Sequence, residues 1–421
     1  MNDFKKIQEL ADYCAHCVTK PCQVGCPLNN DITSFVALVK EEKIKEAYEL
    51  LSKTTVLPSV CGRICPHEKQ CQGMCVKKVS FHSVEIGKLE AFVGDMALKN
   101  HWKIETTDMP IRKKKVAVVG AGPASLTCAA FLRRDGYPVT IFEKYEHLGG
   151  LMYHGIPEFR LPKKLLKEVI DEILDLGIEV RTKEVLGSTF TLNDLEKEYD
   201  AIFLGFGANV SAKMNISGED LVGVYGGNEL LKLNNHPNYT NKVVVVSGGG
   251  NVAMDVSRTV KRLGAKKVYV VYRRSMKEAP AEKKEIEAAM DEGIEFLFQK
   301  NITKILGDKC VTGVELKSTK LEKVEGKPRL EPVNIEGTEN IMACDYVIMA
   351  VGAFPEKSVV SSLGLLLDKR GKIVIDENGR TSKENVFAGG DLAGVKGTVA
   401  FAARSGRNAA DAIKEYLEKK R

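Results

Sequence analysis

The sequence has no long apolar run: no segment approaches the ~18–20 apolar residues that a membrane-spanning helix needs. Its first ten residues, MNDFKKIQEL, contain neither an apolar core nor a small-residue cleavage site, so we expect no export signal and a cytoplasmic location. A strong charge of one sign is also absent, because 62 basic residues face 56 acidic ones. The net charge of +6 is too small for a nucleic-acid-binding surface.

The composition describes a globular chain of several domains. At 421 residues the chain is too long for one ordinary core, and a typical domain size gives roughly three domains. Hydrophobic residues make up 44% and charged residues 28%, as in soluble proteins. The basic run at 112–115 directly precedes an apolar segment, and we interpret it as a solvated linker.

Cysteine is concentrated near the N-terminus. Eight of the eleven cysteines lie between Cys14 and Cys75, whereas Cys128, Cys310 and Cys344 stand in apolar stretches and are expected in the core. Such a group could form a disulfide framework, a zinc site or an iron–sulfur cluster. A reducing cytoplasm disfavours disulfides, which leaves a metal site.

The spacing of the cysteines favours iron–sulfur clusters, with zinc as the alternative. Zinc sites usually combine two short Cys or His pairs separated by a dozen or more residues. Here the first run resembles that of bacterial ferredoxins, whose last cysteine, before a proline, binds a second cluster: Cys14, Cys17, Cys22 and Cys26. A second run supplies four more cysteines: Cys61, Cys65, Cys71 and Cys75. Counting alone gives each of two [4Fe-4S] clusters four cysteines.

The segment between the two runs, 31–54, predicts a small helical domain. Its apolar residues follow the 3.6-residue spacing of amphipathic helices, and Asp31 can cap the first of them.

A first dinucleotide-binding fingerprint begins at residue 116. An apolar strand at 116–119 leads into Gly120-x-Gly122 and then a helix, so backbone amides and the helix N-terminus can bind a pyrophosphate. Ser125 occupies the third small position, which is a departure from Gly or Ala. Glu143 ends the next strand and can accept hydrogen bonds from an adenosine ribose. This site predicts FAD or NAD.

A second fingerprint begins at residue 243. Gly248, Gly250 and Ala253 follow the strand 243–246, and the next strand ends at Arg273 and Arg274. A guanidinium pair there can bind a ribose 2′-phosphate, which predicts NADP(H); the alternative is a solvated basic turn.

A third apolar segment near the C-terminus completes the first site. The strand 386–388 is followed by Gly389, Gly390 and Asp391, whose carboxylate suits a sugar or ribityl hydroxyl. Thr398 is the expected N-cap of the last helix, whose positive end would stabilise negative charge on a reduced flavin.

These motifs together resemble the glutamate synthase small-subunit family of NAD(P)H-dependent flavin and iron–sulfur oxidoreductases. The segments that carry the resemblance span nearly the whole chain: CAHC…PCQVGCP, VCGRICP…CQGMC, VEIGKLE, VVGAGPA, GGLMYHGIPEFRLPK, GGGNVAMD, VYRRS and FAGGD. Related proteins are the N-terminal region of dihydropyrimidine dehydrogenase, the large subunit of ferredoxin:NADP oxidoreductase and sulfide dehydrogenase flavoprotein subunits.

The resemblance implies a different division of the metal ligands from the simple count. One cluster would be bound by Cys14, Cys17, Cys22 and Cys75, and the other by Cys26, Cys65, Cys71 and Glu90. Cys61 would then bind no cluster, although it stays the alternative to Glu90.

The resemblance also implies an α/β fold with two Rossmann-like domains, the NADP domain inserted in the FAD domain, behind a small all-α iron–sulfur domain. The expected boundaries are 1–110 for the iron–sulfur domain, 111–235 and 357–421 for the FAD domain, and 236–356 for the NADP(H) domain. We expect FAD contacts from Gly120, Gly122, Pro123, Ala124, Glu143, Gly150, Leu151, Arg160, Gly390, Asp391, Thr398 and Val399. We expect NADP(H) contacts from Gly248, Gly250, Asn251, Val252, Arg273 and Arg274.

The function that follows is a subunit through which electrons enter a larger enzyme. Hydride would pass from NADPH to FAD, and single electrons would leave through two [4Fe-4S] clusters to a partner protein; no acid or base residue is needed. The partner would be a glutamate synthase large subunit, or else another FMN or iron–sulfur protein of a dihydropyrimidine dehydrogenase or ferredoxin:NADP oxidoreductase complex. A disulfide reductase is excluded, because 149–163 and the start of the NADP(H) helix contain no cysteine. A non-catalytic, zinc-stabilised scaffold is the remaining alternative.

Overall fold

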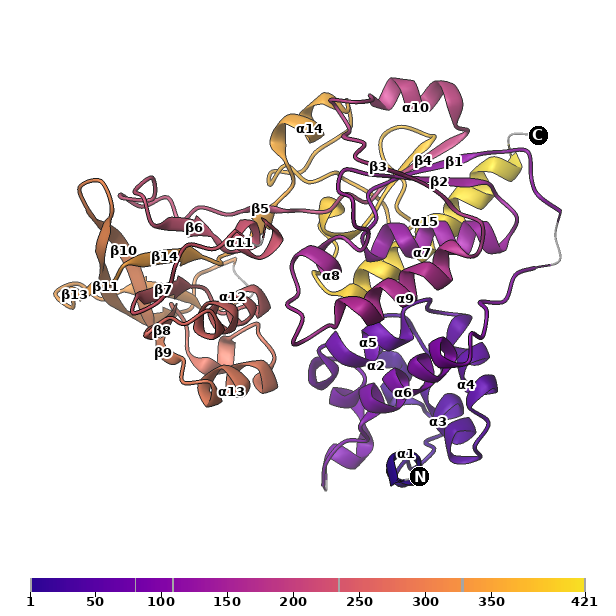
Figure 1. Ribbon diagram of the computed structural model, residues 1–421, viewed down its shortest axis with the longest axis horizontal. Coiled ribbons are helices and arrows are strands. Elements are labelled where there is room, and N and C mark those ends of the chain that lie inside the picture. Colours follow the sequence, from indigo (N-terminus) through magenta and orange to yellow (C-terminus); the bar gives the residue numbers. More distant parts are fainter. Residues whose placement is uncertain (1, 80, 108–109, 234, 327–328, 420–421) are drawn as a thin grey trace. The chain divides into compact units, whose positions relative to one another are not determined.

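The computed structural model describes residues 2–79, 81–107, 110–233, 235–326 and 329–419. The chain divides into two compact units (Figure 1). The first unit consists of Met1–Tyr153, Glu158–Ala208 and Pro355–Arg421, and the second of His154–Pro157 and Asn209–Phe354. The second unit is therefore an insertion in the chain of the first.

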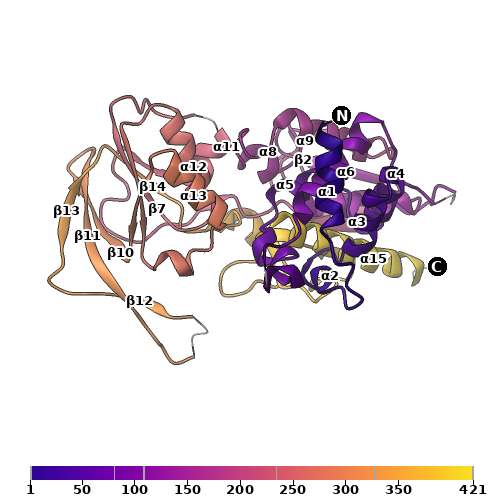
Figure 2. The same cartoon turned by 90° about the horizontal axis from the view of Figure 1, so that it is seen from below.

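The cysteine-rich head of the first unit is helical, as predicted (Figure 2). Its helices are α1 (Asn2–Asp12), α2 (Pro21–Gly25), α3 (Ile32–Lys40), α4 (Ile44–Ser52), α5 (Pro58–Ile64) and α6 (Ile86–Lys99). Three 3-10 turns lie between α5 and α6: η1 (His67–Lys69), η2 (Gln72–Met74) and η3 (Val76–Val79). Asp31 caps α3 by accepting a hydrogen bond from Ser34 N–H (3.4 Å), as expected. The apolar faces of α3, α4 and α6 meet in a core that includes Phe35, Leu51 and Leu89.

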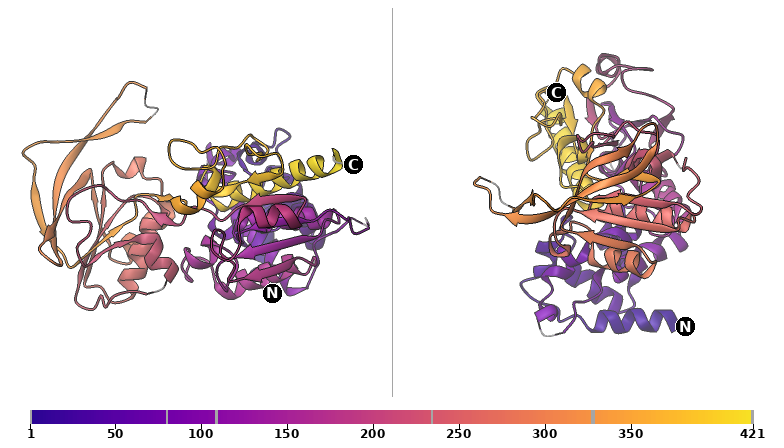
Figure 3. Two further views of the ribbon diagram at one scale, coloured as in Figure 1. Left: turned by 90° about the horizontal axis from the view of Figure 1, so that it is seen from above. Right: turned by 90° about the vertical axis from the view of Figure 1, so that its left-hand side faces the viewer.

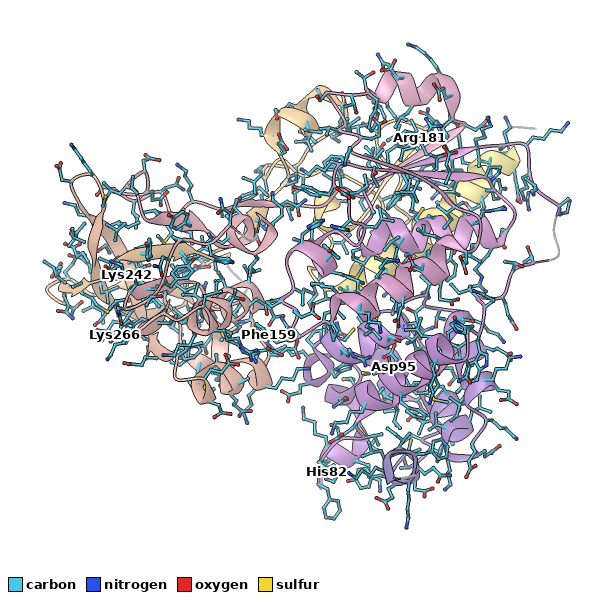
Figure 4. The ribbon with its side chains drawn as sticks, viewed as in Figure 1. His82, Asp95, Phe159, Arg181, Lys242 and Lys266 are labelled. Carbon is cyan, nitrogen blue, oxygen red and sulfur yellow. The ribbon has the colours of Figure 1, made fainter. Side chains whose placement is uncertain are left out.

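Helices α5 and α6 pack unusually closely. A Cβ on Gly62 of α5 would stand 2.3 Å from the backbone nitrogen of Ala91, so only glycine permits this approach. Arg63 of α5 reaches Asp95 of α6 with two hydrogen bonds of 2.9 and 2.6 Å; Figure 4 labels Asp95. The packing of α5 on α6 therefore holds the start of the second cysteine run, in α5, close to Glu90 in α6.

The rest of the first unit is a parallel five-stranded sheet with helices. Its strand order is β16-β4-β1-β2-β3, with β1 (Val116–Val119), β2 (Val139–Glu143), β3 (Glu179–Thr182), β4 (Ala201–Leu204) and β16 (Val386–Ala388). The helices are α7 (Pro123–Arg134), α8 (Leu151–His154), α9 (Lys163–Leu174), α10 (Leu192–Glu198), α14 (Lys357–Ser362) and α15 (Val399–Lys419), with the 3-10 turn η5 (Gly390–Ala393). Every residue of β1, β2, β4 and β16 is buried, which explains why these segments read as continuous apolar runs.

The second unit contains a parallel sheet of the same kind. Its strand order is β6-β14-β7-β8-β9, with β6 (Val224–Gly226), β7 (Val243–Ser247), β8 (Lys267–Tyr272), β9 (Glu295–Phe298) and β14 (Tyr346–Met349). Its helices are α11 (Gly227–Leu233), α12 (Asn251–Arg262) and α13 (Lys283–Asp291), with the 3-10 turn η4 (Met276–Glu278). Two short strands, β5 (Val210–Ser211) and β15 (Ala353–Phe354), pair where the chain enters and leaves this unit.

An antiparallel sheet in the second unit was not predicted. It is formed by β10 (Lys300–Gly307), β11 (Val311–Glu322), β12 (Glu331–Asn334) and β13 (Asn340–Ala343), with β11 pairing with the other three (Figure 3). The sequence of this sheet alternates weakly, because many of its residues are only half buried.

The predicted domain boundary at 235/236 differs from the division in the structure. Residues 209–235 belong to the second unit, because β6 pairs with β14 in that unit's sheet. The C-terminal boundary, expected at 356/357, falls at 354/355. The strand 201–204 ends shortly before the insertion, whereas the strand 346–349 belongs to it, because β14 pairs with β6 and β7.

Candidate functional site: cysteine groups and two dinucleotide turns

The first predicted ligand set surrounds one cavity of the head. Its walls are apolar and include Ile32, Val84 and Ile86, and its cysteines are Cys14, Cys17, Cys22 and Cys75. Burial raises the pKa of Cys22 to about 11, and the neighbouring Cys14 and Cys75 add to the rise. The fold therefore brings four thiols from two distant loops to one hollow.

The second predicted ligand set is also brought together. Burial raises the pKa of Cys26 to about 12, and Glu90 and Cys65 are close enough to raise it further. Burial is likewise the main reason that the pKa of Cys71 is raised, followed by the charges of Glu90, Cys26 and Cys65. A metal centre would reverse this by favouring the ionised forms, and three thiolates with one carboxylate fit an iron–sulfur cluster.

Glu90 is a buried acidic residue. Only 5% of it is exposed, and burial raises its pKa to about 8 despite a hydrogen bond from Asn30 Nδ2 (3.2 Å). A carboxylate buried in this way is stable when a positive centre accompanies it.

Cys61 lies beside the second set. It is 1% exposed in α5, one helical turn before Cys65, whose backbone N–H donates to the Cys61 carbonyl (3.1 Å). A hydrogen bond with Cys65 lowers the pKa of the Cys61 thiol, but burial and the charge of Glu90 outweigh it and leave the pKa raised. Within the described residues, no group of three or more His, Cys, Asp or Glu side chains that could hold a metal ion is found. The two ligand sets therefore stay predictions.

Glu90→Ala and Cys61→Ser test which residue completes the second set. We expect Glu90→Ala to lower iron from about eight to about four atoms per chain, because a site with three ligands releases its cluster. Cys61→Ser should keep all the iron. Iron and acid-labile sulfide in anaerobically purified protein measure both, and the reverse pattern would assign the ligand to Cys61.

The first glycine fingerprint forms the turn between β1 and α7. Gly120 has a left-handed backbone (φ +92°), and a Cβ there would stand 2.7 Å from the Cα of Phe206. Glu143 at the end of β2 is 5% exposed and accepts hydrogen bonds from the backbone N–H groups of Ala121 (2.8 Å) and Tyr145 (3.0 Å). Glu143 thus holds the turn in shape, and its remaining lone pairs are available to a ribose.

The structure shows a role for Ser125, which stands where the fingerprint usually has Gly or Ala. Its hydroxyl donates to the carbonyl of Gly205 (3.3 Å), and a Cβ on Gly205 would stand 2.3 Å from the Ser125 oxygen. The serine thus ties α7 to the chain that follows β4.

The beginnings of α7 and α15 lie close together. A Cβ on Gly390 would contact the methyl groups of Ala124 (3.4 Å) and Ala402 (4.0 Å), one from each helix. The Thr398 hydroxyl accepts from Phe401 N–H (3.3 Å), which confirms it as the N-cap of α15. Both helices thus present the positive ends of their dipoles to one region.

Asp391 stands at this junction with an available carboxylate. Burial raises its pKa, and no donor among the described residues is hydrogen-bonded to its side chain. This arrangement suits a hydroxyl of a bound cofactor.

Gly406→Ala is expected to separate α15 from α7. The added Cβ would stand 2.0 Å from the backbone oxygen of Ala124, so the helices must move apart at a cost of about 1–3 kcal/mol. FAD should then dissociate on dilution, which flavin fluorescence of the filtrate measures. Arg404→Ala, at an exposed position of the same helix, is the control that should retain FAD. Equal retention by both variants would contradict the close contact.

The segment 149–163 packs against the first turn. The Gly149 N–H donates to the Ala121 carbonyl (2.9 Å), and a Cβ on Gly150 would stand 2.8 Å from the Cα of Gly122. Leu151 begins α8, and Arg160 is half buried and engaged by a neighbour.

The second fingerprint repeats the first one inside the second unit. Gly248 is left-handed (φ +143°), and a Cβ there would stand 2.3 Å from the carbonyl oxygen of Ala350 after β14. Gly250 is the N-cap of α12, so Asn251 and Val252 form its first turn. The Asn251 Oδ1 accepts from the backbone N–H of Glu282 (3.2 Å).

The two arginines after β8 have different surroundings. Arg273 is exposed, and its guanidinium is hydrogen-bonded to no other described residue. The Arg274 side chain is 11% exposed and donates to the Leu330 carbonyl (3.3 Å) and to Glu331 (3.3 Å). Arg273 is therefore the arginine that is free to bind a phosphate.

Comparison with known proteins agrees with this arrangement. The family model "Pyridine nucleotide-disulphide oxidoreductase" matches residues 114–414, and the model "Dihydropyrimidine dehydrogenase domain II, 4Fe-4S cluster" matches residues 2–102. The glutamate synthase [NADPH] small chain of Halomonas elongata is 35% identical over 97% of this chain and 90% of its own. This chain belongs to the glutamate synthase small-subunit family. It is an oxidoreductase with a 4Fe-4S domain and a flavin-type dinucleotide fold, as the motifs predicted.

Other members of this wider group of proteins are larger. The NADPH-Fe(3+) oxidoreductase subunit beta of Geobacter sulfurreducens is 36% identical over 95% of this chain, which spans 64% of that relative. Among solved structures, FprA of Mycobacterium tuberculosis in complex with NADPH has a TM-score of 0.65 at 20% identity, over 73% of this chain and 85% of its own. That likeness concerns the fold.

The disulfide chemistry in the family model's name would need a cysteine pair beside the flavin, and residues 149–163 contain no cysteine. Of the three cysteines expected in the core, Cys128 and Cys344 are buried, each in a different unit, whereas Cys310 is exposed in the second unit, so the prediction was wrong for Cys310. No helix of the described chain is long and apolar enough to span a membrane.

No sequence motif includes three polar residues that lie near the second ligand set: Asn30, Thr54 and Arg407. They lie in ordinary loop and helix contexts, so no local pattern distinguishes them.

Proposed function

We propose that this member of the family transfers hydride from NADPH to FAD and delivers single electrons through two [4Fe-4S] clusters to a partner protein. The single observation that carries the proposal is the cavity lined by Cys14, Cys17, Cys22 and Cys75, within the unit that also contains the first dinucleotide turn. A flavin accepts a hydride and releases its electrons singly, which is the chemistry that bound cofactors would supply.

The residues of the chain have defined tasks in this proposal. The turn at Gly120 and Gly122 and the start of α7 bind the pyrophosphate of FAD, and Glu143 binds its ribose. The positive end of α15 stabilises negative charge on the flavin ring, and Asp391 orients a ribityl hydroxyl. In the second unit, Gly248, Gly250 and α12 bind the NADPH pyrophosphate, and Arg273 binds the 2′-phosphate.

The partner we favour is a large subunit of the glutamate synthase type. The likeness to the small chain of Halomonas elongata covers nearly all of both chains and supports this choice. The second candidate is a partner of the dihydropyrimidine dehydrogenase or ferredoxin:NADP oxidoreductase type, which the description of the model for residues 2–102 favours.

Anaerobic purification tests the proposal. We expect about eight iron and eight sulfide per chain, one FAD, and broad absorbance near the flavin bands that NADPH bleaches. Stoichiometric zinc without acid-labile sulfide would refute the account and support the scaffold alternative. Copurification with a large subunit that forms glutamate from glutamine would identify the partner, and recovery of a pyrimidine-reducing subunit would favour the second candidate.

A further inference from the structure

Among the residues that the structure describes, the hydrogen-bond donor to Glu90 is Asn30, and it is buried with Glu90. Asn30 is 1% exposed, and its Nδ2 donates to Glu90 Oε1 (3.2 Å). Asn30 lies four residues after Cys26, on the loop that connects this predicted ligand to the N-cap of α3. One loop thus provides a thiol of the second set and the partner of its carboxylate.

Thr54 determines which end of the Asn30 amide faces Glu90. The Thr54 hydroxyl donates to Asn30 Oδ1 at 2.7 Å. The same hydroxyl lies 3.2 Å from the Leu51 carbonyl, but that carbonyl already accepts the backbone N–H groups of Thr54 and Thr55 (3.0 Å each). The shorter bond therefore holds the amide oxygen toward Thr54 and the NH2 group toward Glu90, where an ionised carboxylate can only accept.

Arg407 of α15 donates hydrogen bonds to the backbone on both sides of this contact. Its Nη1 donates to the Leu28 carbonyl (3.0 Å) and to the Thr54 carbonyl (2.6 Å). The guanidinium thus connects the loop before Asn30 to Thr54. Burial lowers the pKa of Arg407, and the charge of Cys26 is among those that raise it. Since Thr398 is the N-cap of α15, one helix links the predicted flavin site to the loop of the second ligand set.

We propose that Asn30, oriented by Thr54, is the positioning residue that holds Glu90 as an oxygen ligand of the second cluster, and that Arg407 fixes this network to α15. The Asn30 amide occupies Glu90 Oε1, which leaves Glu90 Oε2 to bind a single iron. The inference rests on the proposed iron–sulfur function and adds residues that act through Glu90.

Two isosteric variants of the full chain test the inference. Thr54→Val removes the hydroxyl that orients the amide, and Asn30→Asp replaces the NH2 donor by an oxygen that repels Glu90. We expect both variants to change the electron paramagnetic resonance signal of one reduced cluster. We also expect the loss rate of that cluster in air to increase at least about tenfold, because losing a group that hydrogen-bonds to a metal ligand typically lowers metal affinity by about 10–100-fold. Thr54→Ser should restore the wild-type signal and loss rate.

Thr127→Val is the matched control. Thr127 is fully buried in α7, and its hydroxyl has no hydrogen-bond partner in the described part of the chain, so its removal costs no bond there. Circular dichroism and FAD content should match the wild type in every variant, which separates a cluster effect from misfolding. If correctly folded Thr54→Val and Asn30→Asp retain the wild-type signal and loss rate, the inference is overturned.

Arg407→Gln tests the link to α15. Removing this half-buried cation, on which the charge of Cys26 acts, should lower the midpoint potential of one cluster, since positive charge favours the reduced form. An unchanged potential would overturn this part of the inference.

The outcomes separate this inference from the proposed function. Wild-type protein without iron or sulfide would refute the function itself. A Glu90→Ala variant with both clusters intact would overturn the ligand assignment and this inference with it. A change in Glu90→Ala but not in the Asn30 and Thr54 variants would overturn the inference alone.

Discussion

Cys22→Ser is expected to remove the first cluster and to stop electron export while leaving the flavin in place. Cys22 is nearly buried and lines the cavity formed by the first ligand set, where a serine oxygen is a poorer ligand for iron than a thiolate. Iron should fall from about eight to about four atoms per chain, as measured with acid-labile sulfide. NADPH should still bleach the flavin at a rate within about twofold of the wild type, because hydride transfer does not require the first cluster.

Cys310→Ser is the control for the cysteine substitution. Cys310 is exposed and belongs to the second unit, so iron and flavin content should both stay unchanged. Full iron in Cys22→Ser would show that Cys22 binds no cluster. Loss of FAD together with iron would mean that the head is needed to fold the flavin site.

Arg273→Ala is expected to raise the KM for NADPH by about 10–100-fold and that for NADH by less than about twofold. The exposed guanidinium of Arg273 has no hydrogen-bond partner among the described residues that it would lose on binding. A charge-assisted bond to a 2′-phosphate contributes about 1.5–3 kcal/mol. Steady-state kinetics with both nucleotides and one artificial electron acceptor measure the two constants.

Arg274→Ala serves as the comparison for Arg273→Ala. Its side chain is held by Glu331 and the Leu330 carbonyl, so its removal should affect both nucleotides alike. If Arg273→Ala also changes the two KM values equally, Arg273 does not bind the 2′-phosphate. A selective effect of Arg274→Ala would assign that task to the second arginine.

Local patterns were enough to predict most elements around the site. Strand, glycine turn and helix follow one another within about thirty residues, so β1, β2, β7 and β16 were expected where they occur. N-caps are also local, and Asp31 and Thr398 both form the predicted hydrogen bonds. The antiparallel sheet of β10 to β13 was missed, because its half-buried strands lack a clear alternation.

The position of Cys61 shows what cysteine spacing alone cannot predict. It stands one helical turn before Cys65, and the structure places its thiol beside the second ligand set rather than away from it. The sequence contains eight cysteines, but the choice between Cys61 and Glu90 depends on how α5 packs against α6.

The sequence by itself determined the kinds of chemistry in this protein: thiols at cluster spacing, two phosphate-binding turns, and a family resemblance that the comparisons confirmed. These features depend on residues close together in the chain, whose backbone geometry follows from short-range sterics and hydrogen bonding. Only the tertiary structure decided that Arg273 is free while Arg274 is held, and that α7 and α15 meet at Gly406. It also brought Asn30 to Glu90, Thr54 to Asn30, and Arg407 to the Leu28 and Thr54 carbonyls. These contacts join residues up to 379 positions apart and leave no local pattern.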